Sequence, residues 1–155
     1  MAREQYMRQV ELLVRTLPFI ARQDVFALKG GTAINLFYRD MPRLSVDIDL
    51  TYLPAEDRDA TLAGIDAALD RIREDLLRNL RGVTVQRIAG GGNNDTRVLV
   101  RQGSTEVKIE TSPVARGTVH PPELRPVTDV VADTFGFAEM QVVAFEDLFG
   151  GKLHA

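Results

Sequence analysis

The chain has 155 residues, 45% of them hydrophobic, which suffices for one globular domain with a sizeable core. The formal net charge of −3 excludes a general attraction to nucleic acid, although 19 Lys and Arg residues leave room for a local basic patch. The absence of cysteine excludes a disulfide scaffold and a thiolate zinc site. The polar N-terminus lacks a signal core and no apolar run approaches membrane-spanning length, so we expect a cytoplasmic protein without membrane contact.

The first half of the chain alternates between helical and strand-like hydrophobic patterns. The expected helices are Arg3–Ala21, Thr32–Arg39 and Ala55–Leu80, and the expected strands are Val25–Leu28 and Val46–Tyr52. The long third helix should bury a stripe formed by Leu62, Ile65, Leu69, Ile72 and Leu76.

The second half changes to a two-residue period, which is typical of strands. The strands expected there are Val83–Ile88, Arg97–Arg101, Glu106–Glu110 and Glu139–Val143. A turn at Gly90–Gly92 separates the first two, a proline-rich connection (Pro113, Pro121, Pro122, Pro126) precedes the last, and a helix should begin at Phe145. This order predicts an α+β fold, with a mixed β-sheet and helices packed mainly on one side.

Asp47 and Asp49 give the strongest functional signal in the sequence. On a strand, alternate residues share a face, so the two carboxylates should point the same way while Val46, Ile48 and Leu50 pack behind them. Adjacent carboxylates repel unless cations lie between them, and Asp is disfavoured in strands. The pair therefore predicts a site for magnesium, with manganese as a substitute, although two exposed strand-end carboxylates would give the same pattern.

A Gly-Gly turn lies a short way upstream in Lys29-Gly30-Gly31-Thr32. Backbone N–H groups at such a turn, where a helix opens, can bind phosphate, although a simple strand-to-helix turn would also use glycine. Neither GxxxxGK[ST] nor GxGxxG occurs. Metal ligands beside a phosphate-binding turn predict phosphoryl or nucleotidyl transfer.

Other candidates surround these two motifs. Lys29 and Arg43 each suit a triphosphate or a solvated surface equally well, and Ser45 shares the face of Asp47 if the strand extends to it. Glu110 shares a strand face with Lys108 and is a candidate third metal ligand, or one exposed residue of an amphipathic strand. The two histidines are far apart and do not form a zinc pattern.

These motifs resemble the DNA polymerase β-like nucleotidyltransferase superfamily, in which Gly-Gly or Gly-Ser precedes Asp-x-Asp. More narrowly, the chain is similar to the AbiEii/AbiGii type IV toxin nucleotidyltransferases. The segments that carry this likeness are Leu28–Ala33, Arg43–Leu50 and Phe145–Ala155.

The resemblance implies a polymerase β-like fold and a magnesium-dependent transfer of a nucleotide from a nucleoside triphosphate, with pyrophosphate release. The acceptor would be RNA such as tRNA, or protein, and the enzyme would be a toxin with a cognate antitoxin. Ser45, Asp47, Asp49 and Lys152 would be catalytic. Lys29, Gly30, Gly31, Thr32, Arg43 and Ser45 would bind the nucleotide. Asp47, Asp49 and Glu110 would bind metal. A non-catalytic nucleotide- or partner-binding domain and a small-molecule nucleotidyltransferase of the antibiotic-modifying kind are the alternatives.

The sequence ends inside an expected helix, at Gly151–Ala155, without a stop signal. We therefore interpret residues 1–155 as a nucleotidyltransferase core from a longer protein whose C-terminal helical domain is missing. Phe145, Leu148, Phe149 and Leu153 would form an apolar face on this helix, which predicts self-association of the truncated chain.

Overall fold

The computed structural model describes residues 2–30, 47–88, 96–111 and 122–143, which form a mixed α+β fold. Its seven strands make one sheet in the order β3-β4-β5-β2-β1-β7-β6. The strands are β1 (Phe26–Lys29), β2 (Asp47–Tyr52), β3 (Val83–Ile88), β4 (Thr96–Gln102), β5 (Thr105–Thr111), β6 (Glu123–Pro126) and β7 (Glu139–Val142). The helices in the described ranges are α1 (Ala2–Ala21), α3 (Arg58–Asn79) and α4 (Asp129–Phe135). The prediction of an α+β fold with a mixed sheet is confirmed.

Strand β2 lies at the centre of this sheet. It pairs in parallel with β5 and antiparallel with β1, and β1 pairs in parallel with β7. Strands β3, β4 and β5 form an antiparallel meander on one side of β2, while β6 pairs antiparallel with β7 at the other edge. Because β1 and β2 run in opposite directions, β1 ends where β2 begins.

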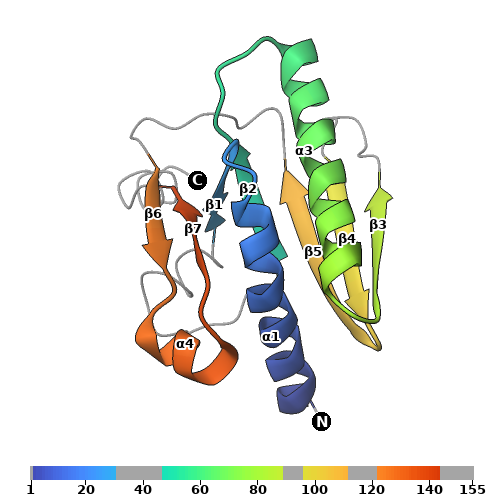
Figure 1. The fold of residues 1–155 in the computed structure, drawn as a ribbon, viewed down its shortest axis with the longest axis vertical. Helices are drawn as coiled ribbons and strands as arrows, with labels where there is room; N and C mark the ends of the chain where they lie inside the picture. Colours follow the sequence, from blue (N-terminus) through green and yellow to red (C-terminus); the bar gives the residue numbers. More distant parts are fainter. Residues whose placement is uncertain (1, 31–46, 89–95, 112–121, 144–155) are drawn as a thin grey trace.

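Helices α1 and α3 cross the same face of the sheet (Figure 1). Ile48, Leu50 and Tyr52 of β2 are buried, as are Val107 and Ile109 of β5, and these residues belong to one hydrophobic core with the helices. At the β3 edge, Arg87 ties the sheet to α3 through ion pairs of 2.6 Å with both Asp66 and Asp70. The charged residues that alternate with the buried positions of β2 and β5 therefore lie on the opposite face.

The helix α3 begins three residues later than the sequence pattern predicts. Asp57 caps it, since its side chain accepts a 2.8 Å hydrogen bond from the backbone N–H of Ala60, and capping by Asp satisfies an otherwise free donor. The predicted stripe is buried except for Leu62, which is only partly covered. The buried residues of α3 are Thr61, Ile65, Ala68, Leu69, Ile72 and Leu76.

The expected proline-rich connection is wrong at its end, because Glu123–Pro126 forms strand β6. Proline is tolerated on an edge strand, where one side of the ladder has no partner, and Pro126 is the last residue of β6. The sequence analysis also missed α4, whose N-cap is Thr128 and whose C-cap is Gly136 at φ +111°. The predicted helices at 32–39 and 145–155 and the turn at 90–92 lie outside the described residues.

Candidate active site

The two aspartates of β2 open the central strand. Asp47 and Asp49 are partly buried and alternate with the fully buried Ile48 and Leu50. The alternation places both carboxylates on the sheet face opposite α1 and α3, as the sequence predicts. Two neighbouring strands, β1 and β5, flank the pair, so side chains of these strands lie beside the two carboxylates.

Gly30, directly after β1, lies against the carboxylate of Asp49. Its φ of +83° falls in the left-handed region that favours glycine. A Cβ built on Gly30 would lie 2.7 Å from Oδ2 of Asp49, closer than real Cβ contacts. The missing side chain thus allows the backbone of Gly30 to approach the carboxylate of Asp49, although the two residues are 19 positions apart in the sequence.

A row of four charged residues crosses the sheet at this point. Lys29 of β1 is the register partner of Asp49, Asp49 is the partner of Glu110 on β5, and Glu110 is the partner of Arg97 on β4. Register partners on neighbouring strands point to the same face. The row, which we call the charge row, therefore places two acids side by side between two cations. Asp47 lies next to it, beside Lys108 of β5.

The surroundings of Asp49 disfavour its negative charge. Burial raises the pKa of the Asp49 carboxyl, and the negative charge of Glu110 raises that pKa further. Lys29 lowers it and Asp47 raises it, and the net direction is upward. A cation bound beside Asp49 would reverse this balance, so the electrostatics of the site favour a positively charged ligand.

Glu110 is held by cations of its own strand and of β4. Its Oε1 lies 3.6 Å from Nζ of Lys108 and 3.9 Å from Nε of Arg97. No group of three or more Asp, Glu, His or Cys residues in the described ranges is arranged to hold a metal ion. Magnesium usually takes one or two carboxylates and completes its shell with water and phosphate oxygens. Asp47 and Asp49 fit such a magnesium site; Glu110 lies within ion-pair distance of Lys108 and Arg97, and its role as a metal ligand stays a prediction.

The other predicted site residues, Gly31, Thr32, Arg43, Ser45 and Lys152, lie outside the described residues. Ser45 is two residues before the start of β2. The backbone N–H of Val143, the last described residue before the segment with Lys152, donates a 2.9 Å hydrogen bond to the carbonyl of Leu28 on β1.

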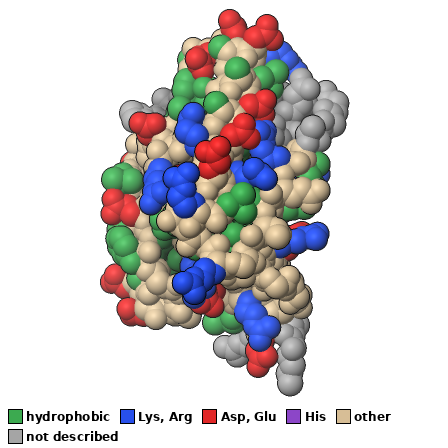
Figure 2. Space-filling view, turned by 45° about the vertical axis from the view of Figure 1, so that its right-hand side comes forward, with side chains coloured by type: hydrophobic (Ala, Val, Ile, Leu, Met, Phe, Trp, Pro, Cys, Tyr) green, Lys and Arg blue, Asp and Glu red, His purple; other side chains and the backbone are tan. Residues whose placement is uncertain are grey.

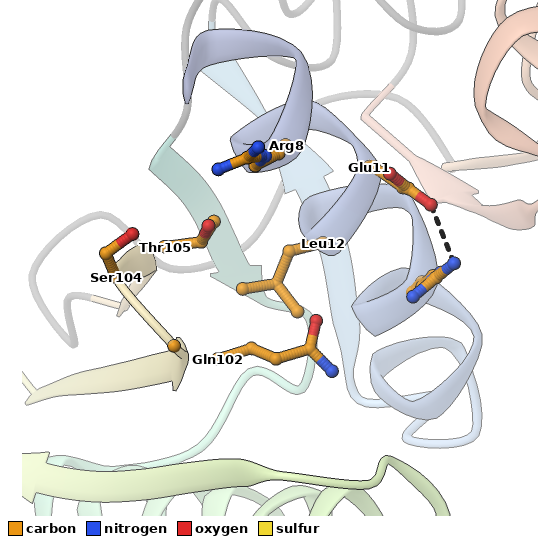
Figure 3. A pocket seen from close by; sticks show the side chains of 8 residues that line it. Arg8, Glu11, Leu12, Gln102, Ser104 and Thr105 are labelled. Atoms are coloured by element: carbon orange, nitrogen blue, oxygen red, sulfur yellow. Dashed lines mark hydrogen bonds and ion pairs between the residues drawn. The ribbon is translucent and has the colours of Figure 1, made fainter. Parts of the chain in front are cut away.

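A hollow that the sequence analysis missed lies on the helical side of the sheet (Figure 3). It measures about 280 Å³ between α1 and the β4–β5 hairpin, and its lining includes Arg8, Arg15, Gln102 and Ser104. Arg15 pairs there with Glu11 at 2.6 Å. The lining residue Thr105 precedes Glu110 by five positions, or about 17 Å along β5, so this hollow is separate from the acidic pair.

The molecular surface near α3 carries both signs of charge. Figure 2 shows Lys and Arg side chains interspersed with Asp and Glu on this side, in keeping with the small net charge. No helix in the described ranges is both long and apolar enough to span a bilayer.

Paired carboxylates on a central strand, against a glycine turn and a lysine, define a site suited to phosphate and a divalent cation. The family comparison agrees with this class of site. The model described as "Nucleotidyl transferase AbiEii toxin, Type IV TA system" matches residues 11–155, and the chain belongs to this family. No curated protein and no solved structure matches the chain. Family membership makes the chain a nucleotidyltransferase toxin of a type IV toxin–antitoxin system, which implies a nucleotide substrate and an antitoxin partner.

Proposed function

We propose that the protein transfers a nucleotide from a nucleoside triphosphate to an acceptor at the face of Asp47 and Asp49. An acceptor oxygen forms a bond to the α-phosphorus as the bond from that phosphorus to the bridging oxygen of the β-phosphate breaks. Pyrophosphate leaves, and the acceptor proton passes to solvent. The observation that carries this proposal is the contact between Gly30 and Asp49, which joins a turn suited to phosphate with a carboxylate suited to a cation.

In this reaction the acidic residues would bind metal, and the basic residues and backbone N–H groups would bind phosphate. Asp47 and Asp49 would hold magnesium, which supplies positive charge for the attacking and leaving oxygens when bound. Lys29 lies beside Asp49 in register and would face the triphosphate, together with the N–H groups of the turn that begins at Gly30. Gly31, Thr32, Arg43, Ser45 and Lys152 complete the proposed set of nucleotide-binding and catalytic residues on the basis of family resemblance.

The acceptor that we propose is an RNA such as tRNA, with protein and aminoglycoside as the competing acceptor classes. A screen with radiolabelled nucleoside triphosphates against the three acceptors separates them. Transfer to an aminoglycoside alone would show that the acceptor is a small molecule rather than RNA or protein.

The test of the site compares Asp49→Asn with Asp133→Asn, a matched change at an exposed position of α4. Loss of metal-dependent stabilisation, worth several kcal/mol, should reduce nucleotide transfer by Asp49→Asn by about a hundredfold or more. Calorimetry should show magnesium-dependent nucleotide binding in the wild type and in Asp133→Asn only. Unchanged transfer by Asp49→Asn would refute the metal role of this carboxylate.

A second candidate function is nucleotide binding without catalysis. It is favoured by the ion pairs of Glu110 with Lys108 and Arg97, because a carboxylate that two cations already neutralise has less need of a metal ion. In that case calorimetry would show nucleotide affinity that does not depend on magnesium, and Asp49→Asn would bind nucleotide as tightly as the wild type.

A further inference from the structure

Lys108 and Arg97 converge on a single anionic oxygen at the edge of the candidate active site. Both nitrogens lie within 4 Å of Oε1 of Glu110, but neither is within hydrogen-bond distance. The two cationic side chains remain 36% and 50% exposed, respectively. Exposed ion pairs of this length contribute little free energy, so another anion can displace the carboxylate of Glu110.

A second ion pair between β4 and β5 provides a comparison, because its charged atoms are much closer together. Arg101 of β4 and Glu106 of β5 are also register partners, on the same face as Arg97 and Glu110. Their Nε and Oε2 atoms are only 2.6 Å apart, and the two side chains are 58% and 39% exposed. The strand geometry therefore permits close pairing. The looser contact occurs where Glu110 is shared between two cations and faces the negative charge of Asp49.

Lys108 and Arg97 lie on the side of Asp49 that faces away from Gly30, and this position suits the binding of a second anionic group. Along the charge row, Lys29 and the Gly30 turn lie on the β1 side of Asp49, while Glu110 and Arg97 lie on the β5 and β4 side. Lys108 is on the same side, next to Asp47. An in-line displacement needs the leaving and attacking groups on opposite sides of the phosphorus. If the triphosphate tail contacts the glycine turn, a second anionic group approaches from the side of β5.

We propose that Lys108 and Arg97 bind a phosphate group of a substrate, and that Glu110 occupies these cations as an internal anion until that phosphate arrives. The proposal rests on the proposed function for the identity of the neighbouring site. The phosphate belongs either to the nucleoside triphosphate or to a phosphorylated acceptor. The chemistry is the same for both, because a guanidinium and an ammonium form charge-assisted hydrogen bonds with phosphate oxygens.

The experiment uses inorganic tripolyphosphate without metal as its first probe, titrated calorimetrically into four variants. Lys108→Gln and Arg97→Gln should each weaken binding about tenfold, the effect of one charge-assisted hydrogen bond. Arg101→Gln removes the same charge from the same strand and face, about 13 Å away, and should stay within about twofold of wild type. Glu110→Gln removes the competing anion and should tighten binding.

Two further arms identify the source of the phosphate. One titrates a nucleoside triphosphate with magnesium, and the other titrates a 5′-phosphorylated RNA oligonucleotide. Weakened nucleotide binding by the Lys108 and Arg97 variants assigns the phosphate to the nucleotide, and weakened RNA binding alone assigns it to the acceptor. Equal losses in Arg97→Gln and Arg101→Gln, or no tightening in Glu110→Gln, would overturn the proposal. If the phosphate-binding role of Lys108 and Arg97 is refuted but magnesium-dependent nucleotide binding still requires Asp49, the proposed function remains supported.

Discussion

Replacing Gly30 by alanine tests whether the contact between the glycine turn and Asp49 matters for function. Gly82 provides a matched control, since it also has a positive φ, +72°, but open space where its Cβ would lie. Both changes place alanine in the left-handed region, at a cost of about 1–2 kcal/mol, less about 0.4–1 kcal/mol from the reduced freedom of the unfolded chain. Gly82→Ala should therefore destabilise the protein by about 1 kcal/mol.

Gly30→Ala carries an additional cost, because its new Cβ would meet Oδ2 of Asp49 at 2.7 Å. Asp49 belongs to a strand that is paired on both sides, so its backbone has little room to move. Moving the carboxylate off its rotamer adds about 0.5–1.5 kcal/mol. The total is about 2 kcal/mol. Gly30→Ala should therefore be about 1 kcal/mol less stable than Gly82→Ala. For a chain of this length, one kcal/mol shifts the unfolding temperature by about 2–4 °C, so the two unfolding temperatures should differ by about that amount.

The decisive measurement is binding rather than stability. Calorimetric titration of a nucleoside triphosphate with magnesium should show clearly reduced affinity for Gly30→Ala and wild-type affinity for Gly82→Ala, since only the former displaces Asp49. Thermal unfolding of both variants supplies the stability comparison. Equal magnesium-dependent affinity in the two variants would refute the argument that the turn and the carboxylate act together.

Asp49, Gly64 and Tyr52 allow three further tests by substitution. Asp49→Asn should raise the unfolding midpoint of the metal-free protein at pH 7. The pKa of Asp49 is raised on folding, so the wild type loses stability as pH rises through the unfolded and then the folded pKa; the advantage of Asn should vanish in acid, and an advantage that persists there would contradict this reasoning. Gly64→Ala should destabilise by about 1–3 kcal/mol in chemical denaturation despite better helix propensity, because its Cβ would collide with the hydroxyl of Tyr52; a stabilised variant would show that the ring moves freely. Burial and a hydrogen bond to Glu56 raise the pKa of Tyr52 to about 12, so an absorbance titration should show late ionisation of this tyrosine and a loss of stability from about pH 10 upward that is absent in Tyr52→Phe.

Local sequence patterns predicted most of the central sheet and the acidic pair. Val107 and Ile109 alternate with Lys108 and Glu110, and this period alone identifies β5 and its buried face. Strand β6 could not be found in this way, because its burial is slight and its pairing with β7 depends on tertiary contact. The helix α4 did carry start and stop signals in the sequence, since Thr128 is its N-cap and Gly136 is its C-cap.

The charge row could not be predicted at all from spacing. Lys29, Asp49, Arg97 and Glu110 come from four strands, and only the register of those strands places them in one line. A shift of one residue in any strand would move its charge to the other face of the sheet. The sequence proposed Glu110 as a metal ligand from its strand face alone. The structure adds the contacts of Glu110 with Lys108 and Arg97, and these make it possible to test whether a substrate phosphate displaces Glu110 from the two cations.

Charged residues on neighbouring strands are arranged differently at the candidate active site than at the far end of the β4–β5 hairpin. At the far end of the β4–β5 hairpin, Arg101 and Glu106 satisfy each other across the strands. At the candidate active site, two acids are register partners, one of them has a raised pKa, and the adjacent turn uses a backbone conformation that favours glycine. Like charges opposite each other and a partly buried carboxylate both disfavour folding. These costs gather around Asp49, and a divalent cation with phosphate would offset them together. The physical argument for a ligand at this position therefore stands independently of the family match.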